Sequence, residues 1–513
     1  MSDGKVMNRW LVVVGAILIQ LCLGAIYAWS VFTPALTART PADVAAIYSE
    51  TALGLGPAQL DNLRADMDVL DAQLKEARAD YSNRIAEATD PAKIEQLTKE
   101  QEEAEAEIVA AMERSAEDYG VLERTGQLRF ALSKTEAQAI FSAGLALFAI
   151  VMVIAGRMMP TLGPQKLALG GGLVLGLGYL LAGVVAPGQF WSTFLFVGIV
   201  GGSGIGLGYV VPIAVGMKWF PDMKGLITGL AVAGFGFGAL LWVKLAGSWG
   251  NLIGQLGVAN TFIIYGIAFA VLCLIGSLWM KNPPEGYRPA GWEPPQASGG
   301  GRPVAGTVDF TTGQMLATPQ FYMIFLCFVF GAGAGLMSIG LMKLFPSQAL
   351  EASGYSAVEA SAIAGTAMAV FFSLANGIGR IVWGTLSDLL GRKLSIFLML
   401  ATQGVLVIAF QWMAGTVWLL YLGAALIGFN FGGNFALFPT ITADTFGTKF
   451  IGQNYGWVFL AYGIGGIFGP LLGGKLGDLQ SFPLAFSICG LLVLFAAVVI
   501  VFVSPPRHRQ QVE

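Results

Sequence analysis

Residues 376–393 read Asn-Gly-Ile-Gly-Arg-Ile-Val-Trp-Gly-Thr-Leu-Ser-Asp-Leu-Leu-Gly-Arg-Lys, and this stretch decides which fold is expected. It closes an apolar run whose interior holds one charge, Arg380, eight residues before Asp388. Since a helix rises about 1.5 Å per residue, Arg380 lies about 12 Å inside the end of that run. The pattern predicts a helix that crosses a membrane and carries a charged side chain deep within it.

The composition favours a membrane protein with many spans. The chain has 513 residues, of which 55% are hydrophobic and 12% charged, and its mean hydropathy is +0.68. One water-soluble core cannot hide that much apolar surface. Residues 11–33 carry no charge, and about twenty apolar residues suffice to cross the hydrocarbon layer. This run is too long for a cleavable signal peptide and no small-residue cleavage site follows it, so we predict that it is the first span.

The apolar runs predict an all-α membrane protein of twelve transmembrane helices in two six-helix bundles. The runs are 11–33, 135–156, 166–186, 190–217, 225–247, 260–280, 320–345, 358–386, 394–413, 416–442, 453–474 and 482–504. A polar stretch rich in Pro and Gly divides them six and six. The predicted units are the N-terminus with the first span (1–36), an insertion (37–133), spans two to six (134–281), a cytoplasmic linker (282–318), the C-terminal bundle (319–504) and a cytoplasmic tail (505–513).

The short loops predict the orientation. Lys and Arg recur in alternate loops, and positive residues are retained on the cytoplasmic side. Both termini are therefore expected in the cytoplasm, in a multi-pass protein of the plasma (inner) membrane. The four cysteines lie in apolar runs without metal-ligand spacing, so we expect neither a metal site nor a cofactor.

The two halves of the chain resemble each other, as in a duplicated transporter. Gly225 and Gly229 open the fifth run, while Gly452 and Gly456 open the eleventh, each pair after a Phe and a Lys. Glycines at such positions allow helices to approach closely.

The insertion at 37–133 is predicted to form a helical hairpin outside the membrane. It holds 20 of the 32 acidic residues. Apolar residues from Leu60 to Ile85 repeat at spacings of three and four, which is typical of a coiled coil. Asp90 and Pro91 break this helix and start a second, antiparallel one. Residues 57–118 either bind a periplasmic partner or mediate self-association, or they form a tolerated extension without an essential role.

Arg380 is the predicted centre of the binding site. No acidic residue in the spans can neutralise it, and a guanidinium matches a carboxylate with two hydrogen bonds. The counter-ion is then the substrate. Asn376 lies four residues earlier on the same helix face and can bind the same ligand. The alternative for Arg380 is a structural bond to carbonyls at a helix break.

Four further polar side chains lie at comparable depth: Tyr209, Asn430, Asn434 and Tyr462. Each is a candidate substrate contact, with a hydrogen bond between helices as the alternative. Tyr27 and Trp29 are weaker candidates, because aromatic residues near a membrane surface are commonly interface anchors.

The loop that begins at Gly384 and continues through Asp388, Gly391, Arg392 and Lys393 resembles the G-x-x-x-D-x-x-G-R-[RK] loop of the major facilitator superfamily. The resemblance implies the major facilitator fold and a cytoplasmic latch that gates transport. The first-half copy begins at Gly156 and has Pro160 in place of the acid, so only the second latch is complete.

Further motifs resemble the oxalate/formate antiporter family over nearly the whole chain outside the insertion. They are Gly208-Tyr-Val-Val-Pro212, Lys218-Trp-Phe-Pro221, Asn282-Pro-Pro-Glu-Gly286-Tyr287, Asn376-Gly-Ile-Gly-Arg380, Phe438-Pro439 and Tyr455-Gly456. The resemblance implies that Arg380 holds a substrate carboxylate. The family's oxalate exchangers also use an eleventh-span lysine, and Tyr462 stands at that position here. Relatives that transport monocarboxylates pair an eighth-span Asn or Asp with the arginine, which Asn376 matches.

We therefore expect a secondary transporter that moves a monocarboxylate such as lactate, pyruvate or formate by alternating access. One cation suits one negative charge, because a dianion would keep an uncompensated charge. The alternatives are an oxalate/formate-type dicarboxylate exchanger and a transport-dead sensor that signals through the hairpin. The absence of His, Cys or acid clusters argues against an enzyme, and no nucleic acid is expected as a partner. Without an acid in a span interior, we expect anion exchange or uptake of a proton together with the substrate.

Overall fold

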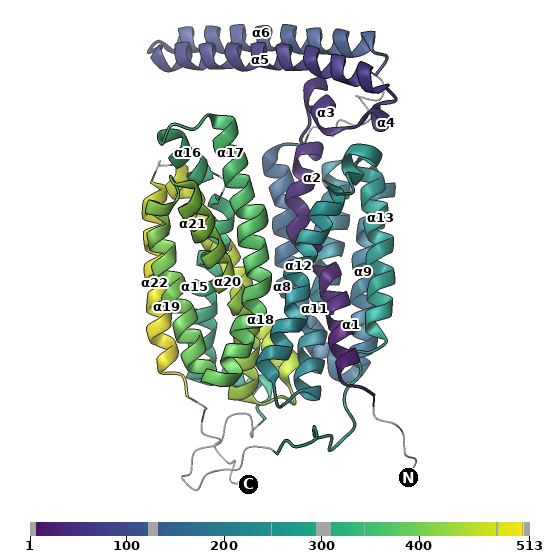
Figure 1. Ribbon diagram of the computed structural model, residues 1–513, viewed down its shortest axis with the longest axis vertical. Helices are drawn as coiled ribbons and strands as arrows, with labels where there is room; N and C mark the ends of the chain where they lie inside the picture. Colours follow the sequence, from purple (N-terminus) through teal and green to yellow (C-terminus); the bar gives the residue numbers. More distant parts are fainter. Residues whose placement is uncertain are drawn as a thin grey trace.

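The computed structural model describes residues 7–121, 132–247, 249–293, 309–342, 344–478, 481–504 and 506. All regular structure within these residues is helical, and twelve of the helical segments are long and apolar enough to cross a membrane. The predicted all-α fold of two bundles is confirmed (Figure 1). Residues 294–308 of the predicted linker, and the predicted tail apart from Pro506, lie outside the described residues.

The N-terminal bundle contains the first six spans. They are α1 with η1 and α2 (Trp10–Leu23, Gly24–Ala28, Trp29–Leu36), α8 (Lys134–Leu162), α9 (Pro164–Val184), α10 with η2 and α11 (Phe190–Thr193, Phe194–Gly201, Gly202–Trp219), α12 (Lys224–Ala246) and α13 (Leu252–Ser277).

The C-terminal bundle contains the other six spans. They are α15 (Pro319–Leu341), α17 with η3 and α18 (Ala357–Thr366, Ala367–Phe372, Ser373–Leu390), α19 (Arg392–Met413), α20 (Val417–Phe446), α21 (Ile451–Asp478) and α22 (Phe482–Val501). Two short helices, α14 (Thr312–Leu316) and α16 (Leu344–Ala352), precede and follow α15. The π-helical segment η3 directly precedes α18, the helix that carries Arg380. Such segments occur frequently at functional sites.

The two bundles approach each other on one side of the membrane part, where α18 ends and α12 and α21 begin (Figure 1). We call this the latch side. Glycines permit the approach: a Cβ atom on Gly225 would lie 2.2 Å from the carbonyl oxygen of Gly384, and one on Gly156 would lie 2.2 Å from that of Gly452. Gly225 and Gly452, matched between the halves by sequence, thus occupy matching inter-bundle contacts.

The opposite side, which we call the hairpin side, carries the insertion. Its two long helices are α5 (Pro57–Glu87) and α6 (Pro91–Asp118), with two short helices before them, α3 (Pro41–Ile47) and α4 (Glu50–Leu53). The predicted helix break is confirmed, since the Asp90 carboxylate accepts a hydrogen bond from the Ala92 amide (3.1 Å) and Pro91 starts α6. Leu60, Leu63, Met67 and Leu74 form a buried seam on α5.

The hairpin lies crosswise over the ends of the spanning helices (Figure 1). It is fixed to the N-terminal bundle through the short helices. Arg64 of α5 donates to the carbonyl oxygens of Ala45 (3.0 Å) and Tyr48 (3.2 Å), and the amide of Ser49 donates to Gly254 of α13 (2.8 Å). A role for 57–118 in self-association or partner binding stays a prediction.

Candidate functional site

Arg380 is fully buried where α18 of one bundle meets α12 of the other. Its Nε donates to Asn376 Oδ1 (3.0 Å), and its Nη1 donates to the carbonyl oxygen of Val232 in α12 (2.8 Å). Its Nη2 has no hydrogen-bond partner. No carboxylate among the described residues forms an ion pair with Arg380. The alternative interpretation of Arg380 expected a structural bond to a carbonyl, and the bond to Val232 is such a contact. It leaves Nη2 without a hydrogen-bond partner and the positive charge without a counter-ion among the described residues.

Aromatic side chains from both bundles surround this guanidinium. Its central carbon lies 4.2 Å from the ring centroid of Phe435 in α20 and 5.6 Å from that of Phe235 in α12. Ring faces attract a cation, but only partly replace an anion. Four tyrosine hydroxyls also interact electrostatically with Arg380: those of Tyr27, Tyr209, Tyr455 and Tyr462. We call Arg380, Asn376 and these four tyrosines the Arg380 cluster.

The tyrosines of the Arg380 cluster fall into two pairs. The hydroxyls of Tyr27 in η1 and Tyr462 in α21 hydrogen-bond to each other and so join the two bundles. The hydroxyls of Tyr209 and Tyr455 are buried without a hydrogen-bond partner. A buried hydroxyl without a partner costs free energy. Two hydroxyls and one guanidinium nitrogen are thus available to a ligand with oxygen acceptors.

The structure brings Arg380, Asn376, Tyr209 and Tyr462 together, but places the two other predicted residues differently. Asn430 accepts a hydrogen bond from Trp383 Nε1 (3.1 Å), between α20 and α18. Asn434 donates to the carbonyl oxygen of Phe431 (3.0 Å), and its Oδ1 faces Gly331 of α15. Asn430 thus makes a hydrogen bond between helices, as its alternative interpretation expected, whereas Asn434 donates only within α20 and its Oδ1 has no hydrogen-bond partner.

Sequence reasoning ranked one tyrosine of the Arg380 cluster too low and missed another. Tyr27, considered an interface anchor, instead bonds Tyr462, and Trp29 is buried and donates to the carbonyl oxygen of Ala137 (2.9 Å). Tyr455 was noticed only as part of a motif. It precedes Tyr462 by two helical turns and so lies on the same face of α21, a spacing that could have identified it.

The latch has the expected connections between bundles. Asp388, at the end of α18, accepts hydrogen bonds from the amides of Gly225 (2.9 Å) and Leu226 (2.8 Å) in the first turn of α12. Arg392 pairs with Asp388 (2.6 Å) and with Asp444 of α20 (2.9 Å). A carboxylate at a helix N-terminus is stabilised by the unpaired amides and the helix dipole.

The remaining latch residues have separate roles. Lys224 of the N-terminal bundle pairs with Asp444 (2.8 Å), so Asp444 connects cations from both bundles. Gly384 makes the close contact with Gly225, while Gly391 has a positive φ of 86° that ends α18 and lets the chain turn into α19. Lys393 is exposed.

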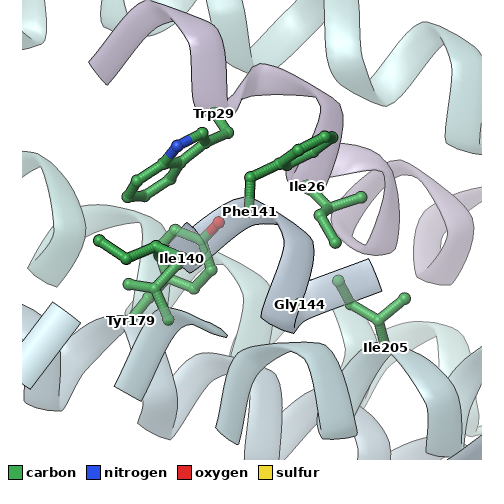
Figure 2. Close-up of a pocket in the computed structure, with 8 residues that line it drawn as sticks. Ile26, Trp29, Ile140, Phe141, Gly144, Tyr179 and Ile205 are labelled. Atoms are coloured by element: carbon green, nitrogen blue, oxygen red, sulfur yellow. The ribbon is translucent and has the colours of Figure 1, made fainter. Parts of the chain in front are cut away.

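A separate apolar pocket lies within the N-terminal bundle. Figure 2 shows the residues around it, among them Ile26, Trp29, Phe141 and Tyr179. Its volume is about 10 Å³, which is the space of about one water molecule. The pocket is therefore too small and too apolar for an organic anion.

The sequence of the chain matches a known family of proteins. The family model "Major Facilitator Superfamily" matches residues 108–372 and 360–513. The chain is 28% identical to the uncharacterized MFS-type transporter YhjX of Escherichia coli (67% of this chain, 80% of YhjX). It is 27% identical to the oxalate:formate antiporter of Oxalobacter formigenes (69% and 79%) and 25% identical to monocarboxylate transporter 14 of Mus musculus (69% and 80%).

Solved structures show the same fold. The human organic anion transporter MFSD10 aligns with a TM-score of 0.57 at 12% identity, covering 96% of this chain and all of that one. The E. coli fucose:proton symporter FucP aligns with a TM-score of 0.53 at 16% identity, over 74% and 93%. The predicted resemblance is confirmed, and the chain belongs to the major facilitator superfamily, a family of membrane transporters rather than enzymes.

Proposed function

We propose that the protein is a secondary active transporter that moves a small monocarboxylate, of the lactate, pyruvate or formate type, by alternating access. The observation that carries the proposal is Arg380, a fully buried cation that forms no ion pair with an acid among the described residues and has one nitrogen without a partner. A carboxylate can accept two hydrogen bonds from such a guanidinium. The names of two relatives, an oxalate:formate antiporter and a monocarboxylate transporter, support this substrate class.

The charge of the Arg380 cluster favours a monoanion. It holds one guanidinium, and Tyr462 occupies the position where the resemblance to oxalate exchangers implies a lysine. A dianion would retain about one uncompensated charge in a poorly solvated site, which is costly. A dicarboxylate exchanger of the oxalate/formate type is the second candidate, favoured by the relative that carries this name.

Alternating access requires the contacts around Arg380 to break. The guanidinium is closed off on the side of α12 by its bond to Val232, and the Tyr27–Tyr462 bond joins the same two bundles. An incoming carboxylate replaces the Val232 carbonyl as the acceptor for Nη1 and gives Nη2 its missing acceptor. Binding then releases a contact between the bundles, which couples the substrate to their relative movement.

Coupling follows from the same charge count. The Arg380 cluster contains no carboxyl or imidazole group that could carry a proton. An unbound, buried Arg380 resists reorientation, so exchange of one anion for another, or movement of the proton with the substrate, is favoured. Uptake into proteoliposomes with and without a pH gradient distinguishes the two. Strong accumulation driven by the gradient alone would exclude the exchange mechanism.

The membrane and the orientation belong to the same proposal. We place the latch side and both termini in the cytoplasm, and the hairpin on the outer face of the plasma (inner) membrane. Membrane-impermeant labelling of a cysteine introduced at exposed Val69 of α5 should succeed in intact cells. Labelling only after the membrane is permeabilised would reverse the assignment.

The test of the binding site is uptake of labelled lactate, pyruvate and formate by proteoliposomes of wild-type protein, Arg380→Gln and Arg380→Lys. Removing the only buried cation of the cluster should lower uptake at least 100-fold, and lysine, which lacks the planar fork, should restore only part of it. Arg84→Gln, on the exposed surface of α5, is the matched control. Normal uptake by both Arg380 variants would refute the assignment.

A further inference from the structure

The latch has a counterpart in the first half of the chain that carries different charges. Gly156, Pro160 and Gly163 at the end of α8 match Gly384, Asp388 and Gly391 at the end of α18. The geometry is matched too, because Gly163 and Gly391 both have positive φ, 79° and 86°. Gly156 meets Gly452 in the first turn of α21 as Gly384 meets Gly225 in the first turn of α12. The backbone of the latch is thus duplicated, but its acid is not.

The second acid of the latch is also changed in the first half. Asp444 lies two residues before Phe446, and Lys218 lies two residues before the matching Phe220. In the second half, Asp388 and Asp444 balance Arg392 and Lys224. In the first half, a proline and a lysine replace the two acids.

A cavity of about 120 Å³ occupies the place of the missing carboxylate. It lies between α8, α11 and the start of α21, and its lining includes Pro160, Lys218, Lys449, Gly452 and Asn282. No acidic residue in the part of the chain that the structure describes lines it. A water molecule needs about 10–15 Å³ by the same measure, so a carboxylate or phosphate group fits.

The charged side chains that line the cavity are two lysines. Lys218 Nζ donates to Asn282 Oδ1 (3.2 Å), and Lys449 Nζ lies 5.4 Å from the ring centroid of Phe450. The amide of Gly452 has no acceptor among the described residues, whereas the equivalent Gly225 amide donates to Asp388. Asp309 accepts a hydrogen bond from the backbone amide of Lys449 (3.0 Å) rather than from its side chain.

We propose that this cavity binds an anionic group, a carboxylate or a phosphate, that replaces the missing acid of the first latch. The group would accept hydrogen bonds from Gly452 and from the two lysines, as Asp388 does from Gly225 and Arg392. It thereby joins α8 to α21 and favours the state in which the bundles are closed on the latch side. This inference does not depend on which substrate Arg380 binds.

The first test is thermal unfolding of purified protein in detergent with increasing inorganic phosphate at constant ionic strength. Saturating phosphate should raise Tm by about 2–4 °C in wild-type protein and equally in Arg380→Gln, which excludes the Arg380 cluster as the site. Pro160→Asp, which restores the carboxylate, should remove this rise, whereas the uncharged Pro160→Asn should keep it. Lys218→Gln with Lys449→Gln should weaken phosphate binding at least tenfold.

The second test identifies the source of the group. Protein in phosphatidylcholine nanodiscs is compared with and without phosphatidylglycerol, in the absence of phosphate. A rise in Tm with phosphatidylglycerol in Pro160→Asn but not in Pro160→Asp indicates a lipid headgroup; a response to phosphate alone indicates a soluble anion. If neither raises Tm, or if Pro160→Asp responds as Pro160→Asn does, the proposal is wrong.

Discussion

Two arginines, Arg380 within the eighth span and Arg392 at the start of the ninth, have opposite surroundings. Arg392 contacts two carboxylates, Asp388 at 2.6 Å and Asp444 at 2.9 Å. Arg380 is more deeply buried, yet its acceptors are an amide oxygen and a backbone carbonyl. A buried charge is costly unless it is paired. The pairing at Arg392 joins Asp388 and Asp444, the two acids that contact Gly225, Leu226 and Lys224 of the other bundle, whereas the missing pairing at Arg380 leaves a place for a ligand's charge.

Asn376→Asp would give Arg380 the acid that it lacks and so make it resemble Arg392. The new carboxylate should pair with Nε, which Asn376 Oδ1 contacts at 3.0 Å, and compete with the substrate. We expect lactate uptake near pH 8 to fall about 100-fold. A tenfold change in binding corresponds to about 1.4 kcal/mol, and breaking a buried ion pair costs several kcal/mol. Uptake should recover as the pH falls, since protonation of the introduced acid frees the guanidinium.

The matched control for this change is Asn376→Leu, which removes the hydrogen bond without adding an acid. It should lower uptake about tenfold, equivalent to about 1.4 kcal/mol, at every pH. An Asn376→Asp variant with the same pH profile as Asn376→Leu would argue against a direct competition for Arg380.

Arg392→Gln makes the opposite change, since it removes the cation that pairs with both Asp388 and Asp444 and leaves Lys224 as the cation paired with Asp444. We expect the free energy of unfolding to fall by about 1–3 kcal/mol and Tm to fall by several degrees, because the ion pairs of Arg392 are mostly shielded from solvent. Arg380→Gln should not lower Tm, as it removes an unpaired buried charge. Thermal unfolding measures both. Arg9→Gln breaks the Arg9–Asp222 pair (2.9 Å) within the N-terminal bundle and is the control for loss of an ion pair outside the latch.

Tyr462→Lys tests whether the number of positive charges near Arg380 controls substrate selectivity. Tyr462 is fully buried and interacts electrostatically with Arg380, so a lysine there adds a second cation. We expect the ratio of oxalate to lactate uptake to rise about tenfold, since a dianion then balances both cations. Tyr462→Met, of similar length but uncharged, should leave the ratio unchanged. An equal rise in both variants would mean that loss of the hydroxyl, rather than charge, controls selectivity.

Glu105→Gln tests an ion pair in water and should have the smallest effect. Hydrogen bonding to Arg78 (2.8 Å) holds the pKa of Glu105 below its usual range. The contribution of this pair is therefore present at neutral pH and lost as the pH falls through the lowered pKa. Because the pair is exposed, we expect a change in Tm of about 1 °C or less and unchanged uptake. Thermal unfolding at pH 7 and pH 4 would detect a larger effect.

Most of the fold could be predicted from sequence, because lipid as solvent makes uncharged runs of twenty residues unambiguous. Ser133 and Glu136 form a capping box at the start of α8, which is a pattern encoded in local sequence. The break between α5 and α6 was predicted from Asp90 and Pro91. The crosswise placement of the hairpin depends on contacts such as Ser49 with Gly254, which no local pattern encodes.

Arg380 and Asn376 at the centre of the candidate site could be predicted from sequence, but the side chains that surround them could not. Arg380 and Asn376 are four residues apart on one helix, so sequence spacing alone places them together. Depth in the membrane could not separate Tyr209, which faces Arg380, from Asn434, which faces Gly331. That distinction depends on the rotation of each helix about its axis. The Tyr27–Tyr462 bond joins residues from opposite bundles and depends on the state of the transporter.

The central claim is that one buried cation selects one negative charge, and competition in wild-type proteoliposomes tests it most directly. Labelled lactate uptake is measured against unlabelled pyruvate, formate and oxalate at a pH where oxalate is fully ionised. We predict that at least one of the two monocarboxylates competes at a concentration about tenfold lower than oxalate does, a difference of about 1.4 kcal/mol. Oxalate competing more strongly than both monocarboxylates would contradict the claim.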